Sequence, residues 1–260
     1  MNKSIVFNKF SMIIDFHTHV GKADPWYKSQ KLQEEKKEKL VDDLLNEMKR
    51  NNVNKSVVIT AYKLPHKLKD ANLELSQSIK NHKDKLIPFA WLDPRIEDSS
   101  ETLELLVEKH GFKGLKLHPL LNGYYLSNEV VFPLIEKSIE LSIPVLIHTG
   151  YGVLGDVNLV SVIAKAYTDA RLVIGHMIEP DCINVAKRHE NVFLETSDAP
   201  HLKVIEKAVK VVGAEKILYG TDYPFCDSIK SEISKIKLAD IKDEEKELIL
   251  SGNATRLLKL

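Results

Sequence analysis

The chain has 260 residues, of which 43% are hydrophobic and 28% charged, and its 37 basic and 37 acidic side chains give a net charge of zero. This length fits one α/β barrel, so we expect residues 1–260 to form a single domain. Balanced charge argues against a nucleic-acid or anionic-membrane partner, because such proteins usually carry a basic excess. Cys182 and Cys226 form no CxxC pair and no apolar run reaches 18 residues, so we expect a cytoplasmic protein without a membrane span.

Eight short apolar runs alternate along the chain with longer amphipathic segments. Each run is rich in Val, Ile, Leu or Phe and is bounded by Gly, Pro or Asp, which is typical of buried strands. The predicted strands are Met12–His19, Ser56–Ala61, Leu86–Leu92, Gly114–His118, Val145–His148, Leu172–His176, Val192–Thr196 and Ile217–Gly220.

The segments between these strands predict helices, because their apolar residues recur at helical spacing. Examples are Lys39–Asn51, Thr102–His110, Glu129–Leu141 and Leu202–Val212. Eight strand–helix units predict a parallel sheet closed into a (β/α)8 TIM barrel. No GxGxxG follows the first strand, which weighs against an open dinucleotide-binding sheet.

Side chains that can bind a metal stand at several strand ends, which in a parallel barrel meet at one mouth. His17 and His19 end the first strand, His148 the fifth and His176 the sixth, and Asp222 follows the eighth. Residues i and i+2 of a strand share a face, so His17 and His19 can chelate one ion. Burying five polar groups separately would be costly, whereas one shared cation satisfies them together. Imidazoles with one carboxylate favour a single Zn²⁺, with Mn²⁺ or Fe²⁺ as alternatives.

The motifs DFHTHVG, GLKLHP, IHTG, IGHM and ILYGTDYP, with the closing GNATRLLKL, occur in the order found in the amidohydrolase superfamily. The chain resembles its amidohydrolase-related branch, which includes aminocarboxymuconate-semialdehyde decarboxylase. This resemblance implies a metal-dependent enzyme in which His17, His19, His148 and Asp222 ligate the ion. It also implies that His176 holds the bound water or polarises the substrate, and that Asp222 moves the water's proton.

The fourth strand carries Lys116 and His118 on one face. Its GLKLHP resembles the urease segment GLKIH, whose lysine is carbamylated and bridges two metals. We favour a different role over carbamylation, in which Lys116 is unmodified and binds a substrate carboxylate beside a single metal. We interpret His118 as a substrate hydrogen-bond donor or a loop cap. Among the aromatic residues that follow strand ends, we expect Trp26 and Tyr151 to line the pocket.

The favoured function at this stage is hydrolysis of a small amide, ester or lactone by metal-activated water. The alternative is metal-dependent decarboxylation of an unsaturated or aromatic carboxylic acid, which the same branch also contains. A TatD-like phosphoesterase or DNase shares the HxH and the late aspartate, but it has a glutamate at strand four, where this chain has Lys116 and His118. A further alternative is a non-enzymatic binding protein whose barrel has lost its activity. The complete set of predicted metal ligands argues against it, because such a protein need not keep every ligand. The expected partner is a small-molecule substrate, and a homodimer is compatible with the sequence.

Overall fold

Eight parallel strands, hydrogen-bonded in the order β1-β2-β3-β4-β5-β6-β7-β8, form the centre of the molecule. The computed structural model describes residues 10, 12–24, 40–225 and 228–260, so Trp26 lies outside the described residues. Each strand pairs with the next one in the chain, which confirms the predicted barrel. The strands are β1 Ile14–Val20, β2 Lys55–Thr60, β3 Leu86–Trp91, β4 Gly114–Leu117, β5 Val145–His148, β6 Leu172–Gly175, β7 Val192–Glu195 and β8 Ile217–Leu218.

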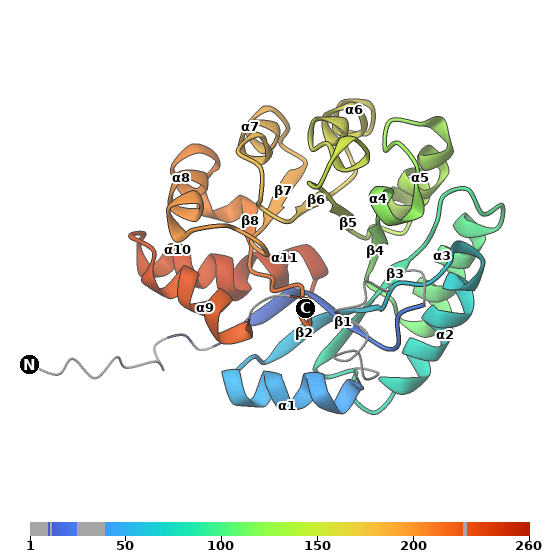
Figure 1. Cartoon of the computed structure of the whole chain (residues 1–260), viewed down its shortest axis with the longest axis horizontal. Helices are drawn as coiled ribbons and strands as arrows, with labels where there is room; N and C mark the ends of the chain where they lie inside the picture. The colour runs from blue at the N-terminus through green and yellow to red at the C-terminus, as the bar shows by residue number, and fades with distance from the viewer. Residues whose placement is uncertain (1–9, 11, 25–39, 226–227) are drawn as a thin grey trace, which may run out of the picture.

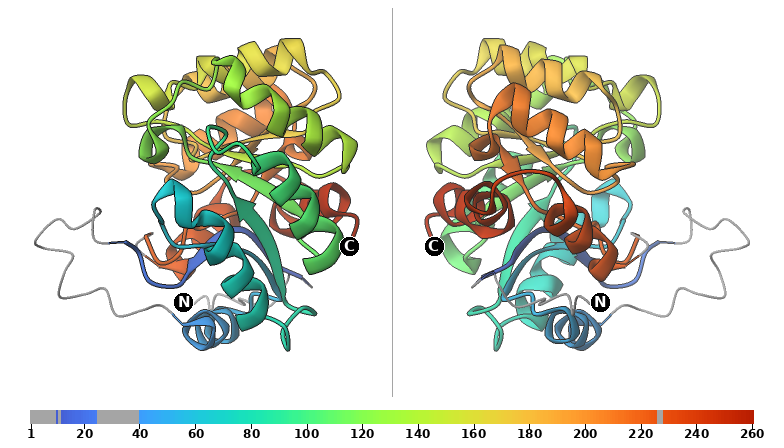
Figure 2. Two further views of the ribbon diagram at one scale, coloured as in Figure 1. Left: turned by 90° about the vertical axis from the view of Figure 1, so that its right-hand side faces the viewer. Right: turned by 90° about the vertical axis from the view of Figure 1, so that its left-hand side faces the viewer.

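Helices surround the strands on the outside (Figure 1) and pack their apolar faces against them. The two side views show the helical layer around the sheet, with the last helix near the C-terminus (Figure 2). Within the described residues, no helix is both long and apolar enough to cross a membrane. The helices are α1 Val41–Asn51, α2 Leu68–Ser78, α3 Ser99–His110, α4 Pro119–Asn122, α5 Phe132–Glu140, α6 Asn158–Ala166, α7 Asp181–Arg188, α8 Leu202–Val212, α9 Ile229–Leu238, α10 Asp243–Glu247 and α11 Asn253–Leu258.

Along the strands, the residues that face the barrel interior change from apolar to polar. Leu146 of β5 belongs to the inner apolar cluster, whereas His148, two residues later, lines a cavity. In β7, Phe193 packs against the same cluster and Glu195 contacts a histidine of β1. Because side chains alternate with a period of two, β5 and β7 each place one apolar residue against the inner cluster and one polar residue nearer the C-terminal end of the strand. The apolar half holds the barrel together, and the polar half forms the site.

The barrel closes through backbone hydrogen bonds between β1 and the segment after β8. Phe16 N donates to Tyr219 O (2.9 Å), and Asp222 N donates to His17 O (2.8 Å). The predicted eighth strand, Ile217–Gly220, is shorter in the structure, because residues beyond Leu218 leave the β7 ladder and bond to β1 instead. A Cβ on Gly220 would stand 2.3 Å from Glu195 Oε1, so only a glycine leaves room for that carboxylate.

Candidate metal centre

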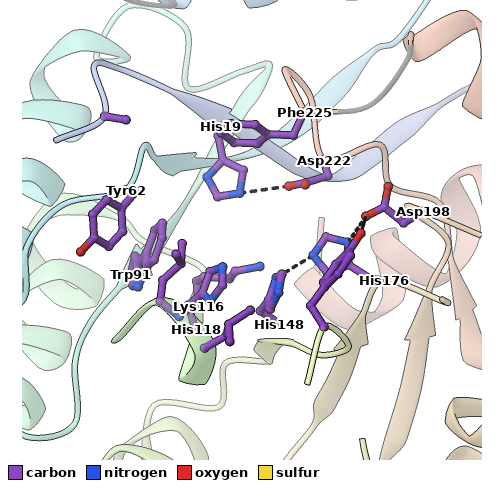
Figure 3. A pocket seen from close by; sticks show the side chains of 14 residues that line it. His19, Tyr62, Trp91, Lys116, His118, His148, His176, Asp198, Asp222 and Phe225 are labelled. Atoms are coloured by element: carbon purple, nitrogen blue, oxygen red, sulfur yellow. Dashed lines mark hydrogen bonds and ion pairs between the residues drawn. The ribbon is translucent and has the colours of Figure 1, made fainter. Parts of the chain in front are cut away.

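A cavity of about 460 Å³ lies among the residues that follow the C-terminal ends of the strands (Figure 3). Most of the predicted site residues line this cavity. His17 is not among the lining residues, because it is fully buried behind His19 and Asp222. Predicted Trp26 falls outside the described residues. The cavity is lined by His19, Ala23, Tyr62, Trp91, Lys116, His118, Leu120, Leu121, His148, Tyr151, His176, Asp198, Asp222 and Phe225.

His17, His19 and Asp222 form one of three groups of potential metal ligands among the described residues. The other two are His17 with His176 and Glu195, and His176 with Asp198 and Asp222. Asp222 Oδ1 lies 3.2 Å from His17 Nε2 and 3.3 Å from His19 Nε2, and the two imidazole nitrogens are 3.2 Å apart. A register shift against β2, between Asp15 and Thr18, accompanies this arrangement in β1. Asp222 itself has a φ of 58°, in the left-handed region, which is a strained conformation of the kind that clusters at functional sites.

The outer hydrogen bonds of His17 and His19 determine which ring nitrogens carry protons. His17 Nδ1 lies 3.1 Å from Glu195 Oε2, and His19 Nδ1 lies 3.0 Å from the carbonyl oxygen of Thr60. Because an oxygen of this kind accepts, each Nδ1 donates and each Nε2 presents a lone pair. Two lone pairs and a carboxylate oxygen then face one another, and they repel unless a cation lies between them. These residues therefore fit a divalent metal ion.

His148 is linked by hydrogen bonds to His176 and Asp198 and is not part of the group formed by His17, His19 and Asp222. Asp198 Oδ2 lies 3.2 Å from His176 Nδ1, and His176 Nε2 lies 2.8 Å from His148 Nδ1. If His176 donates to Asp198, it accepts from His148 Nδ1, which leaves a lone pair on His148 Nε2. That atom is buried and has no hydrogen-bond partner in the described part of the chain. An orphaned lone pair of this kind suits a metal ligand, although His148 is in none of the three groups of potential ligands found among the described residues, whereas His176 is in two.

His176 reaches its place because its backbone leaves the strand pattern. It follows β6 with a φ of 70°, and its ring lies 5.1 Å from that of His17 and 4.5 Å from that of His148. Ser197 Oγ lies 2.9 Å from His176 Nδ1, close to Asp198. The structure thus places His176 behind His148 as a residue that can orient it. The hydrogen bond to His176 lowers the pKa of Asp198, which keeps that carboxylate charged.

Lys116, on β4, extends its side chain to the group formed by His17, His19 and Asp222. Its side chain is almost fully buried, and its Nζ is 2.9 Å from His17 Nε2. Burial lowers the pKa of the Lys116 ammonium to about 8, and nearby Asp222 and Glu195 oppose this shift. The predicted proximity of Lys116 to the metal ligands therefore holds in the structure.

Two buried carboxylates, Glu195 and Asp15, support the site and were not singled out from the sequence. Glu195 Oε2 accepts from His17 Nδ1 and, at 2.7 Å, from Ser197 Oγ. Asp15 accepts from the amide nitrogens of His17 and Thr221, both at 3.1 Å. Burial raises the pKa of Glu195 to about 7 and that of Asp15 to about 8. Glu195 is the penultimate residue of the predicted strand Val192–Thr196 and the last residue of the observed β7, so the strand-end rule applied to carboxylates points to it.

Four aromatic or imidazole rings stand nearly parallel along one side of the cavity. His118 stacks on His148 with ring centroids 3.7 Å apart and on Trp91 at 5.2 Å. Tyr151 continues the series at 6.0 Å from His148, and its hydroxyl donates to Asp198 Oδ2 at 3.1 Å. Asn122 Oδ1 accepts from Trp91 Nε1 at 2.9 Å and fixes the indole. Predicted pocket residues His118 and Tyr151 therefore both lie at the cavity.

The sequence profile of the amidohydrolase family matches residues 14–260, and the chain belongs to this family of metal-dependent barrel enzymes. The sequence has no significant match among curated proteins.

Three solved structures of similar fold have 16–18% sequence identity to the chain. One is 5-carboxyvanillate decarboxylase from Novosphingobium aromaticivorans with manganese and 4-hydroxy-3-methoxy-5-nitrobenzoic acid (TM-score 0.79, 16% identity, 96% of both chains). A second is dihydroxybenzoic acid decarboxylase from Polaromonas sp. JS666 with manganese and 2-nitroresorcinol (TM-score 0.77, 18% identity, covering 96% of this chain and 97% of that one). A third is 2,6-dihydroxybenzoate decarboxylase from Rhizobium (TM-score 0.77, 17% identity, covering 95% of this chain and 98% of that one).

These comparisons correct the leading expectation from the sequence. Hydrolysis of an amide, ester or lactone was wrong as the favoured function, because the similar structures are benzoate decarboxylases. The motifs could not separate the two reactions, since both use the same strand-end ligands. The preference for zinc also lacks support, because two of these structures hold manganese. A site able to hold a divalent ion remains.

Proposed function

We propose that the protein is a metal-dependent decarboxylase of an aromatic or unsaturated carboxylic acid. The observation that carries this proposal is the convergence of His17 Nε2, His19 Nε2 and Asp222 Oδ1, each within 3.3 Å of the other two, beside the buried Lys116. The likeness to three benzoate decarboxylases supports the same reaction class. A cavity of about 460 Å³ bordered by parallel rings suits a small planar acid.

His17, His19, His148 and Asp222 would hold the metal, for which manganese has the support of the similar structures. Bound there, the cation would polarise a substrate oxygen and so stabilise the charge that develops as CO2 departs. Lys116 attracts the substrate anion into the cavity, because its ammonium group belongs to a residue that lines the cavity. His176, through its bond to His148, keeps that ring in the tautomer with a free Nε2.

Asp222 delivers the proton in the proposed reaction. The bond between the substrate carbon and its carboxylate carbon breaks, and the electron pair stays on the substrate carbon. A proton carried by Asp222 is transferred to that carbon, CO2 leaves, and Asp222 regains a proton from solvent. Asp222 is suited to this role because its carboxylate contacts His17 and His19 while 14% of its side chain remains exposed, and it lines the cavity.

The test uses protein purified without chelators and loaded with Mn²⁺. Hydroxylated benzoates are supplied in D2O, and NMR measures deuterium at the carbon that bore the carboxylate while CO2 release is followed in parallel. We expect both signals from the wild type and neither from Asp222→Asn, with metal content measured in each protein. Hydrolysis of lactones or amides without any decarboxylation would overturn the proposal.

A further inference from the structure

The short helix α4 determines which nitrogen of His118 carries its proton. His118 precedes Pro119 at the start of this helix, and the Leu121 amide N–H donates to His118 Nδ1 at 3.2 Å. A nitrogen that accepts from a backbone amide bears no proton, so the ring is neutral and its single N–H is at Nε2. Capping thus makes His118 a hydrogen-bond donor at its other edge.

The rings on either side leave only one edge of His118 open. Trp91 covers one face, with an interplanar angle of 15°, and His148 covers the other, with an angle of 17°. Leu121 N occupies the Nδ1 edge. The residue is 6% exposed and lines the cavity, and Nε2 makes no hydrogen bond to any residue that the structure describes. The open edge of the ring therefore presents an unpaired donor to the substrate.

We propose that His118 is a specificity-determining residue whose Nε2–H binds an oxygen acceptor on the substrate other than the carboxylate that is lost. This inference rests on the proposed function. A site with a fixed, unpaired N–H favours a substrate that supplies the acceptor and rejects an otherwise identical one that lacks it, because the donor is then left unsatisfied. Both faces of the ring are covered, so the donor direction is fixed before the substrate enters.

Two substitutions separate the donor from the cap. The amide of Asn reaches about as far as Nδ1, so His118→Asn can still cap α4 but presents no donor at the Nε2 position. The amide of Gln reaches about as far as Nε2, so His118→Gln retains the donor and loses the cap. A purely structural role for His118 predicts that Gln is the harmful change, whereas our proposal predicts that Asn alone alters selectivity.

The experiment measures KM and kcat of the Mn²⁺-loaded proteins with 2-hydroxybenzoate and with its 2,3-, 2,4-, 2,5- and 2,6-dihydroxy counterparts. For the wild type we expect one dihydroxy isomer to have a KM about tenfold below that of 2-hydroxybenzoate, the ratio of one net hydrogen bond. His118→Asn should abolish this difference, whereas His118→Gln should retain it. Both variants lose the stacked ring, but only His118→Gln also loses the cap, so its melting temperature should fall further.

The two proposals fail in different ways. If no isomer gains over 2-hydroxybenzoate, or if His118→Asn keeps the wild-type preference, the role of His118 is wrong and the decarboxylase proposal stands. If the wild type decarboxylates none of the five acids, the proposed function falls and the role of His118 falls with it.

Discussion

Replacing Glu195 with Gln tests whether the histidine tautomers prepare the site for a metal. The carboxylate is fully buried and accepts from His17 Nδ1, Ser197 Oγ and Ser197 N. Gln has the same shape, but its neutral amide is a weaker acceptor for the His17 N–H, or a donor that opposes it. Losing a supporting carboxylate of this kind typically costs about 10–100-fold in metal affinity, which corresponds to about 1.4–2.7 kcal/mol.

We therefore expect Glu195→Gln to bind Mn²⁺ about 10–100-fold more weakly in a calorimetric titration. The matched control is Glu232→Gln, because Glu232 is also buried but pairs with Lys235 on α9. It should bind Mn²⁺ like the wild type. Unchanged affinity in Glu195→Gln, or an equal loss in both variants, would refute the tautomer argument.

Four further outcomes follow from the same geometry. Lys116→Met should raise KM for an acidic substrate about tenfold, while metal analysis still finds one Mn²⁺ per chain. If the wild type instead bound two equivalents of metal and the variant lost both, Lys116 would be a carbamate that bridges two ions. Asp222→Asn should fold normally by circular dichroism yet lose at least about a hundredfold in turnover, and an active variant would exclude Asp222 as proton donor. Gly220→Ala should lower the free energy of unfolding by about 1–3 kcal/mol in urea titrations, because its Cβ would meet Glu195. Burial raises the pKa of Cys182 to about 12, so this thiol should resist iodoacetamide at pH 8 until the protein is unfolded, as peptide mass spectrometry would show.

Much of the site could be predicted because polar residues at the ends of buried strands stand out in a sequence. His17, His19, His148 and Lys116 were found in this way, and alternation with a period of two then oriented them. His176 was found by the same rule, but its hydrogen bond to His148 was not predicted. The backbone turn at φ 70° that brings the two rings together follows from tertiary packing.

Other features depend on contacts between segments far apart in the chain. The capping bond of His118 and the proton positions on the histidines are fixed by partners that no local pattern identifies. Glu195 lies near the end of a predicted strand, where the strand-end rule applies to it as it does to the histidines. The reaction class could not be read from the ligands, because the ligands are common to hydrolases and decarboxylases of this family.

The seam between β1 and the segment after β8 has a consequence for how the protein matures. Asp222 N donates to His17 O across it, and Thr221 N donates to Asp15 Oδ1 over a separation of 206 residues. Contacts of such long range are entropically costly to form early in folding. On the ribosome, His17 and His19 are made well before Asp222. A nascent chain that lacks Asp222 cannot bring these three side chains together, so we expect a metal ion to bind this group only after Asp222 has been made.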